Sequence, residues 1–213
     1  MSTAFSRGIG PVVFVLGLLA FPCFAAVTEV VYDSTPAITD SWQTTTQGAI
    51  QDRGVEMLLA GTARTLLRAE IGVTLQGVPG TIDVKAKVWA NDGPSQEPGT
   101  LLWESPWIED VSIVGWSQLV PFDIPYIAVP DHITVTIAEK NCTTGLLYGE
   151  PLASSTTVGT TVRNWTHQST GEWTQLEWSK PAAMRITAVP EPVTLALLAA
   201  GVGALWLKRR RKA

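Results

Sequence analysis

Alternation of apolar and polar residues is the feature that most limits how this 213-residue chain can fold. In Thr81–Trp89, apolar side chains fall on every second residue, with charged side chains between them. Successive side chains of a β-strand point to opposite faces, so this spacing predicts a strand with one buried face. Arg64–Leu75, with Leu67 in its apolar phase, and His132–Ala138 repeat the pattern.

Six further stretches alternate less regularly and are also expected to be strands: Val55–Ala60, Glu109–Val114, Gln118–Asp123, Thr160–His167, Glu172–Leu176 and Ala183–Ala188. Clusters of Gly, Pro, Asn and Asp between the stretches predict turns. No stretch of the body has a helical period. Many short alternating strands predict an all-β fold, an antiparallel β-sandwich that is jelly-roll-like.

The N-terminal end reads as a targeting segment. Arg7 precedes an apolar stretch from Ile9 to Phe24, and small residues lie at the −3 and −1 positions of a cut after Ala25. This pattern predicts a signal peptide, residues 1–25, with a signal helix that signal peptidase removes after Ala25. An uncleaved N-terminal anchor is one alternative. A lipoprotein cut at Cys23 is disfavoured because Pro22 stands where a small residue is expected.

The C-terminal end has a second apolar stretch, residues 193–207, which contains no charge. Fifteen helical residues span about 22 Å, which is short of the ~30 Å hydrocarbon core, but lysine and arginine stems can snorkel. We expect a single C-terminal transmembrane helix, followed by a cytoplasmic basic tail of Lys208, Arg209, Arg210, Arg211 and Lys212. The alternative, a buried core helix, would show a polar stripe.

Pro190, Glu191 and Pro192 precede this helix, and the two prolines predict an extended break. The order VPEP, apolar span and arginine-rich tail over residues 189–213 resembles the PEP-CTERM sorting signal of Gram-negative bacteria. The resemblance implies recognition and processing by an exosortase, a membrane protease-transpeptidase, at Pro190, Glu191 and Pro192. It also implies export to the cell envelope, anchoring by the helix, and then a cell-surface or extracellular location.

Residues 26–188 form the expected β-sandwich ectodomain. They contain nine basic and eighteen acidic residues, a net charge of about −9, which argues against nucleic-acid binding. Cys142 is the one cysteine left after signal cleavage, so it either pairs between chains or is buried as a small apolar residue. The two histidines, His132 and His167, have no cysteines at zinc spacing, and no metal or cofactor is expected.

Three blocks of the body, Leu59–Val73, Val88–Ser105 and Gly145–Pro151, resemble a β-sandwich domain common among uncharacterised PEP-CTERM proteins. This second resemblance supports the sandwich fold. It implies no activity and no catalytic residues.

Eight tryptophans fall within residues 26–188. Indole rings on a sandwich can stack on sugar rings, and Trp89, Trp103 and Trp107 are the candidates for contact with an extracellular polysaccharide. Trp89 lies on the outward phase of its strand. The alternative is that the tryptophans fill the core and cross-strand pairs.

Catalytic patterns are weak. The G-x-S-x-G elbow is absent, and Glu109 and Asp110 are neighbours that point to opposite faces of a strand. His132 begins a strand and fits a surface or filler position, and Asn91–Gly93 lacks calcium-loop spacing. The sequence therefore predicts a non-enzymatic surface protein with a structural or interaction role. A carbohydrate-binding module is the alternative, and a secreted hydrolase with two converging carboxylates comes third.

Overall fold

A computed structural model describes residues 27–44, 50–75, 79–143, 148–177 and 180–190. Within these residues, every strand pairing is antiparallel, and the helical segments are two short 3₁₀ helices, η1 (Thr35–Ala37) and η2 (Pro94–Gln96). The all-β prediction is confirmed. The predicted signal helix and the predicted helix 193–207 lie outside the described residues, and no helix inside them is long and apolar enough to span a membrane.

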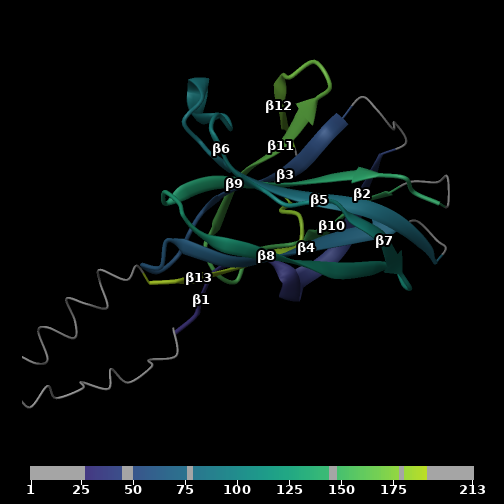
Figure 1. The fold of residues 1–213 in the computed structure, drawn as a ribbon, viewed down its shortest axis with the longest axis horizontal. Helices are drawn as coiled ribbons and strands as arrows, with labels where there is room; N and C mark the ends of the chain where they lie inside the picture. The colour runs from purple at the N-terminus through teal and green to yellow at the C-terminus, as the bar shows by residue number, and fades with distance from the viewer. Residues whose placement is uncertain (1–26, 45–49, 76–78, 144–147, 178–179, 191–213) are drawn as a thin grey trace, which may run out of the picture.

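Two sheets pack face to face (Figure 1). The six-stranded sheet consists of β1 (Glu29–Asp33), β2 (Ile38–Thr44), β4 (Thr65–Leu75), β8 (Ser117–Ala128), β10 (Tyr148–Ala153) and β13 (Met184–Val189). The seven-stranded sheet consists of β3 (Ile50–Leu58), β5 (Gly80–Ala90), β6 (Leu101–Glu104), β7 (Ile108–Ile113), β9 (His132–Lys140), β11 (Thr160–Gln168) and β12 (Trp173–Leu176). Its order is β12-β11-β3-β9-β5-β6, and β7 also pairs with β5.

All nine predicted strands are present, whereas β1, β2, β6 and β10 were not predicted. The predicted apolar phase of β4 is wrong at its start. Leu66 is buried in the core, while Leu67 is half-buried. The pairing of β4 with β8 shifts register between Leu66 and Arg68. An irregularity of this kind inserts a residue and reverses the alternation of side chains before it.

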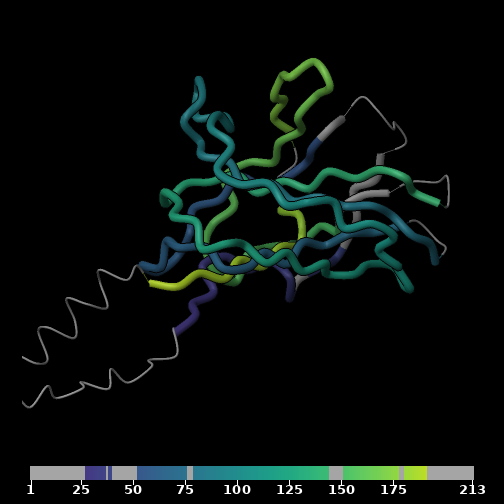
Figure 2. The backbone as a smooth tube through the Cα atoms, viewed as in Figure 1, coloured from purple at the N-terminus to yellow at the C-terminus, as the bar shows by residue number. Residues whose placement is uncertain are grey.

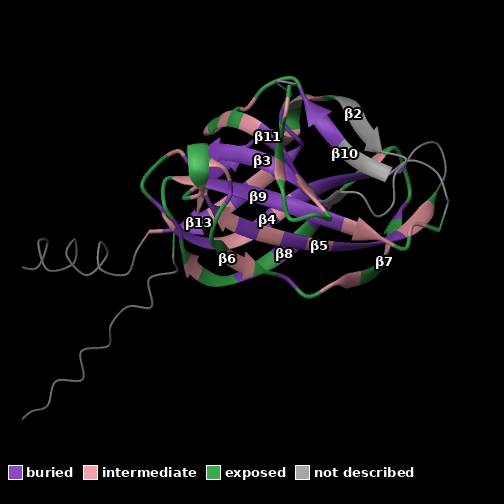
Figure 3. Ribbon diagram, turned by 90° about the horizontal axis from the view of Figure 1, so that it is seen from above, coloured by how far each residue is buried: buried purple, intermediate pink, exposed green. Residues whose placement is uncertain are grey.

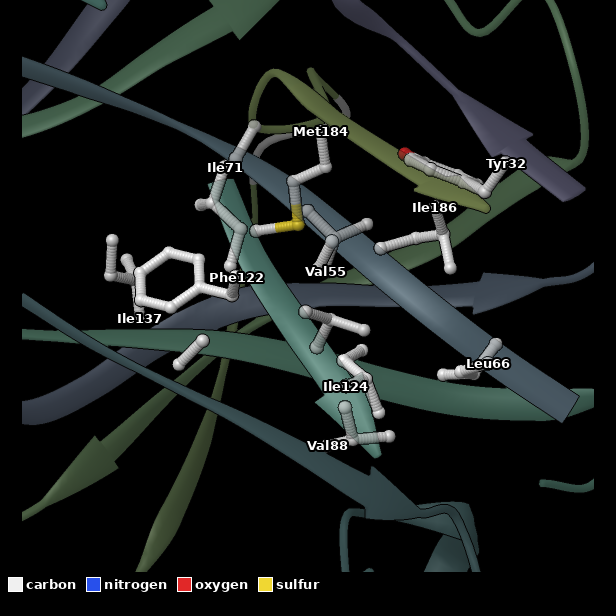
Figure 4. Close-up of a cluster of buried hydrophobic side chains, with 14 of the residues drawn as sticks. Tyr32, Val55, Leu66, Ile71, Val88, Phe122, Ile124, Ile137, Met184 and Ile186 are labelled. Carbon is white, nitrogen blue, oxygen red and sulfur yellow. The ribbon is translucent and has the colours of Figure 1, made fainter. Parts of the chain in front are cut away.

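The core lies between the sheets (Figure 4). Val55 and Ile137 of the seven-stranded sheet meet Ile71 and Met184 of the six-stranded sheet, and all four are buried. Tyr32 of β1 also packs here, with its hydroxyl 2.8 Å from the Thr161 hydroxyl. Burial raises the pKa of Tyr32 to about 12, because the charged phenolate would lose its hydration.

Both ends of the described sandwich lie at one edge of the six-stranded sheet. β13 pairs with β1 on one side and with β4 on the other, and Glu29 stands opposite Ala188. The strand ends at Val189, which is buried. The tube in Figure 2 shows β1 and β13 running together to the same end of the molecule.

Candidate binding face

The seven-stranded sheet turns charged and aromatic side chains away from the core. On β5, Lys85, Lys87 and Trp89 alternate with core residues, so they lie on the opposite side of the sheet. We call this side the outer face. It comprises Asp52, Gly54 and Glu56 of β3, Lys85, Lys87 and Trp89 of β5, Thr134, Thr136 and Lys140 of β9, Arg163, Trp165 and His167 of β11, Trp173 of β12, and Trp107 between β6 and β7.

Strand pairing aligns these residues in rows. Trp89 stands opposite Thr134, Thr134 opposite Glu56, and Glu56 opposite Arg163, so one row crosses four strands. The middle strands β3 and β9 are largely buried even on this side, as Figure 3 shows. Side chains from the flanking strands must therefore cover them.

Glu56 is a carboxylate whose side chain is fully buried within the outer face. Its Oε2 accepts a hydrogen bond from Trp165 Nε1 over 2.6 Å and lies 3.3 Å from Arg163 Nε. Its Oε1 lies 2.6 Å from His132 Nε2. A buried carboxylate needs such donors, because burial removes its hydration. Both oxygens of Glu56 are thus occupied by groups of the protein itself.

Asp52 is the second fully buried carboxylate of the outer face. Lys87 Nζ donates to its Oδ2 over 2.9 Å, and His167 Nδ1 lies 3.0 Å from the same oxygen. Among the described residues, Oδ1 of Asp52 is buried and has no hydrogen-bond partner. The side chains of Lys87 and His167 are slightly exposed, whereas that of Asp52 is fully buried. A ligand approaching this point meets these nitrogen groups before it meets the acid.

Aromatic rings gather over the same part of the outer face. Trp173 stacks on His167 with ring centres 4.4 Å apart, and it packs edge to face with Trp89, their ring centres 5.3 Å apart. Strands β9, β3 and β11 separate β5 from β12, which would be roughly 19 Å in a flat sheet. The sheet therefore curls, and the β11–β12 hairpin leans over the outer face.

The loop between β5 and β6 also leans over the outer face; β6 and β12 rise on the same side of the sandwich in Figure 1. Arg163 donates to the carbonyl of Ser95 over 3.3 Å, and Asn91 Nδ2 donates to the Thr134 hydroxyl over 3.0 Å. Asp92 accepts hydrogen bonds from the backbone and hydroxyl of Thr100. The Thr100 hydroxyl is the largest cause that lowers the pKa of Asp92. The side chains of Asn91 and Asp92 therefore stabilise the loop between β5 and β6.

Near β6 and β7, two ammonium groups lie over one indole ring. Lys140 Nζ is 4.3 Å and Lys85 Nζ is 5.0 Å from the ring centre of Trp107. Lys85 also forms an ion pair with Glu104, and this hydrogen bond lowers the pKa of the Glu104 carboxyl. Contacts of cations with aromatic rings hold long side chains in place at the surface.

The three tryptophans predicted to contact a glycan do not lie together. Trp89 is on the outer face as predicted, but it is half-buried and donates to the Thr136 hydroxyl over 3.1 Å. Trp103 stands opposite Val88 and packs against the core, because paired residues share a face. Trp107 is half-buried on the outer face beside its two lysines. Trp103 thus lies on the core side of the sheet, and Trp89 and Trp107 lie on the outer face.

Other predicted residues have simple positions. Pro190 is half-buried directly after β13, whereas Ala25, Glu191, Pro192 and the basic tail 208–212 lie outside the described residues. Cys142 is half-buried and packs against the core. Within the part of the chain that the structure describes, no group of three His, Cys, Asp or Glu residues could hold a metal ion.

The chain matches no protein-family model, no curated protein and no solved structure.

The sequence did not point to Asp52, Glu56 and His167 as a group. The predicted strand began at Val55, so Asp52 was outside it, while β3 begins at Ile50. The usable signal is the spacing Asp52, Gly54 and Glu56, which places two acids on one strand face around a glycine. A Cβ on Gly54 would come within 2.0 Å of the Val135 carbonyl, so only glycine fits there.

Proposed function

We propose that this chain is an exported surface protein, processed by signal peptidase after Ala25 and by an exosortase at Pro190, Glu191 and Pro192. The β-sandwich would be delivered to the envelope, anchored by residues 193–207, and then held at the surface or released. The observation that carries the proposal is the end of β13 at Val189, directly before the sorting motif. A cut at the motif would leave every described strand intact.

The ectodomain has an interaction role and is not an enzyme. Hydrolysis of a glycosidic bond needs two carboxyl groups about 5–9.5 Å apart and open to the substrate. The backbones of Asp52 and Glu56 are four residues apart on one strand, roughly 13 Å. Both side chains are fully buried. Buried acids of this kind are better placed to hold lysine and arginine side chains in position than to transfer protons to a substrate.

The two sheets also support a jelly-roll-like topology. Successive strands cross between the sheets from β3 to β4 to β5 and from β8 through β11. Crossing of this kind brings distant segments together on one face, which is how residues of β3, β5 and β11 come to share the outer face.

The test is the intact mass of the protein recovered from its native host. The expected mass begins at Ala26 and ends near Pro190–Pro192. A mass that retains Lys208–Lys212 would show that the tail is a permanent anchor, and the exosortase proposal would fall. In parallel, Glu191→Ala is expected to leave the sandwich folded and to block removal of the tail, whereas normal processing of this variant would contradict recognition of the motif.

A second candidate function is a carbohydrate-binding module. It is favoured by the presence of Trp89, Trp107 and Trp173 on one face, although Trp103 is not part of it. In this form the module uses the outer face of the seven-stranded sheet, with Trp173 in place of Trp103.

A further inference from the structure

We propose that the outer face binds an acidic polysaccharide through a layer of cations held over tryptophan rings. This inference rests on the proposed role as a glycan-binding surface module and names the class of glycan. It does not depend on processing at Pro190–Pro192.

The first observation is that the cations of this face share one arrangement. Lys85 and Lys140 lie over Trp107, Lys87 lies 5.8 Å from the ring centre of Trp89, and Arg163 lies 5.6 Å from that of Trp165. The ectodomain has nine basic residues in all, so nearly half of them stand on one side of one sheet. The tryptophan rings beneath these cations hold their side chains against the sheet.

The second observation is that the carboxylates paired with three of these cations are buried. Lys87 pairs with Asp52 and Arg163 with Glu56, and both acids are fully buried. Lys140 lies 4.0 Å from Asp83, which is also buried. Ammonium and guanidinium groups therefore form the layer that a ligand meets, while the neutralising carboxylates lie beneath it. A carboxylate on a ligand can bind the remaining donors of these groups.

Glu104 is the exception among these pairs, because its side chain is about one-third exposed beside Lys85 (36%). A polyanion approaching the outer face would be repelled by Glu104 and would compete with it for Lys85. Removing the charge of Glu104 should therefore improve binding of the polyanion. No such improvement is expected if the cations have only a structural role.

Acidic polysaccharide fits this face better than nucleic acid does. Its sugar rings offer apolar C–H surfaces that can pack on indole rings, and its carboxylates offer charge to the lysines. The dense phosphates of a duplex require many unpaired cations, whereas each cation here has a carboxylate partner and the ectodomain carries about −9. The predicted ligand is thus a chain of exposed sugar rings that carry carboxylates.

The test measures binding of the full chain, purified in nonionic detergent, to immobilised alginate, a polyuronate. Dextran, a neutral glycan, and duplex DNA serve as comparison ligands. We expect binding to alginate that weakens as salt rises, because salt screens surface charges. Lys85→Gln and Lys140→Gln should each lower the affinity by about fivefold, and Glu104→Gln should raise it by a similar factor. Glu104 is partly exposed, and buried Asp83 keeps its hydrogen bonds from Asp110 and Asn141, so none of these changes leaves a buried acid without a donor.

Arg68→Gln is the matched control, since Arg68 is a partly exposed arginine of the other sheet. It should leave the affinity unchanged. Equal binding to dextran, a preference for DNA, or an unchanged affinity in both lysine variants would overturn the acidic-glycan assignment. No binding to either glycan would also overturn the glycan-binding module, while the mass measurement on the sorting motif would be unaffected.

Discussion

Two residues of the outer face, Asp52 and Glu56, are charged and yet fully buried. A sandwich normally keeps its buried side chains apolar and leaves its charged side chains in water. Here Glu56 is buried on the side of the sheet away from the core, where three donors from β9 and β11 surround it. Breaking a buried ion pair costs far more than breaking an exposed one. Substitution of Glu56 therefore measures how much its buried interactions contribute to the stability of the protein.

We expect Glu56→Gln to lower the free energy of unfolding by about 2–4 kcal/mol, because Arg163 and His132 lose the charge that they face. Urea denaturation measures this change. The control is Glu70→Gln, since Glu70 of β4 pairs with Arg185 and Arg68 but is one-quarter exposed. That variant should lose about 1 kcal/mol or less. Equal losses in the two variants would show that the burial of Glu56 has no energetic importance.

The strands with the most regular alternation could be predicted nearly to their bounds, whereas four strands were not predicted. β5 and β9 have a long apolar phase and an outward polar phase, so their bounds could be predicted within a few residues. β6, which was not predicted, has only four residues, and a strand of this length is too short for a period to be clear. The outer face was missed for another reason: strand pairing across β5, β9, β3 and β11 assembles it, and a pattern within one strand does not contain the order of its neighbours.

The junction of β5 and β7 illustrates how an irregularity is stabilised. The register shifts between Ile82 and Val84, and Asp110 of β7 has a φ of 53°. Its backbone N–H donates to the carboxylate of Asp83 over 3.0 Å, and Asn141 donates to the other oxygen. The Asp110 N–H is the main cause that lowers the pKa of Asp83, with Asn141 and Lys140 adding to it. The carboxylate thus satisfies a backbone group left unpaired by the bulge.

This arrangement gives a pH prediction for Asp83→Asn. A folded-state pKa below the unfolded value of about 3.9 means that Asp83 stabilises the protein above that value, and that the contribution is lost as pH falls through the folded-state pKa. The difference in free energy of unfolding between wild type and Asp83→Asn should therefore shrink below about pH 4. Denaturation curves between pH 7 and pH 2.5 measure it. A difference for Asp83→Asn that stays constant over this range would refute the assignment.

At the scale of the whole molecule, the last strand closes the fold. β13 lies between β1 and β4, and its buried residues Met184, Ile186 and Ala188 belong to the core between the sheets. A chain that ends before β13 loses the strand that joins β1 to the rest of its sheet. A chain that ends just after it keeps every described pairing. The described strands therefore end directly before the proposed sorting motif.

We expect residues 26–190, expressed without either apolar end, to unfold cooperatively in urea, because their core and pairings are complete. Residues 26–183 should fail to fold, because removal of β13 exposes the core and leaves β1 with no partner strand. Circular dichroism and amide exchange distinguish the two outcomes. If residues 26–190 did not fold, the segments beyond them would be part of the domain. Cleavage at Pro190–Pro192 would then destroy the sandwich, and a surface function after processing would be excluded.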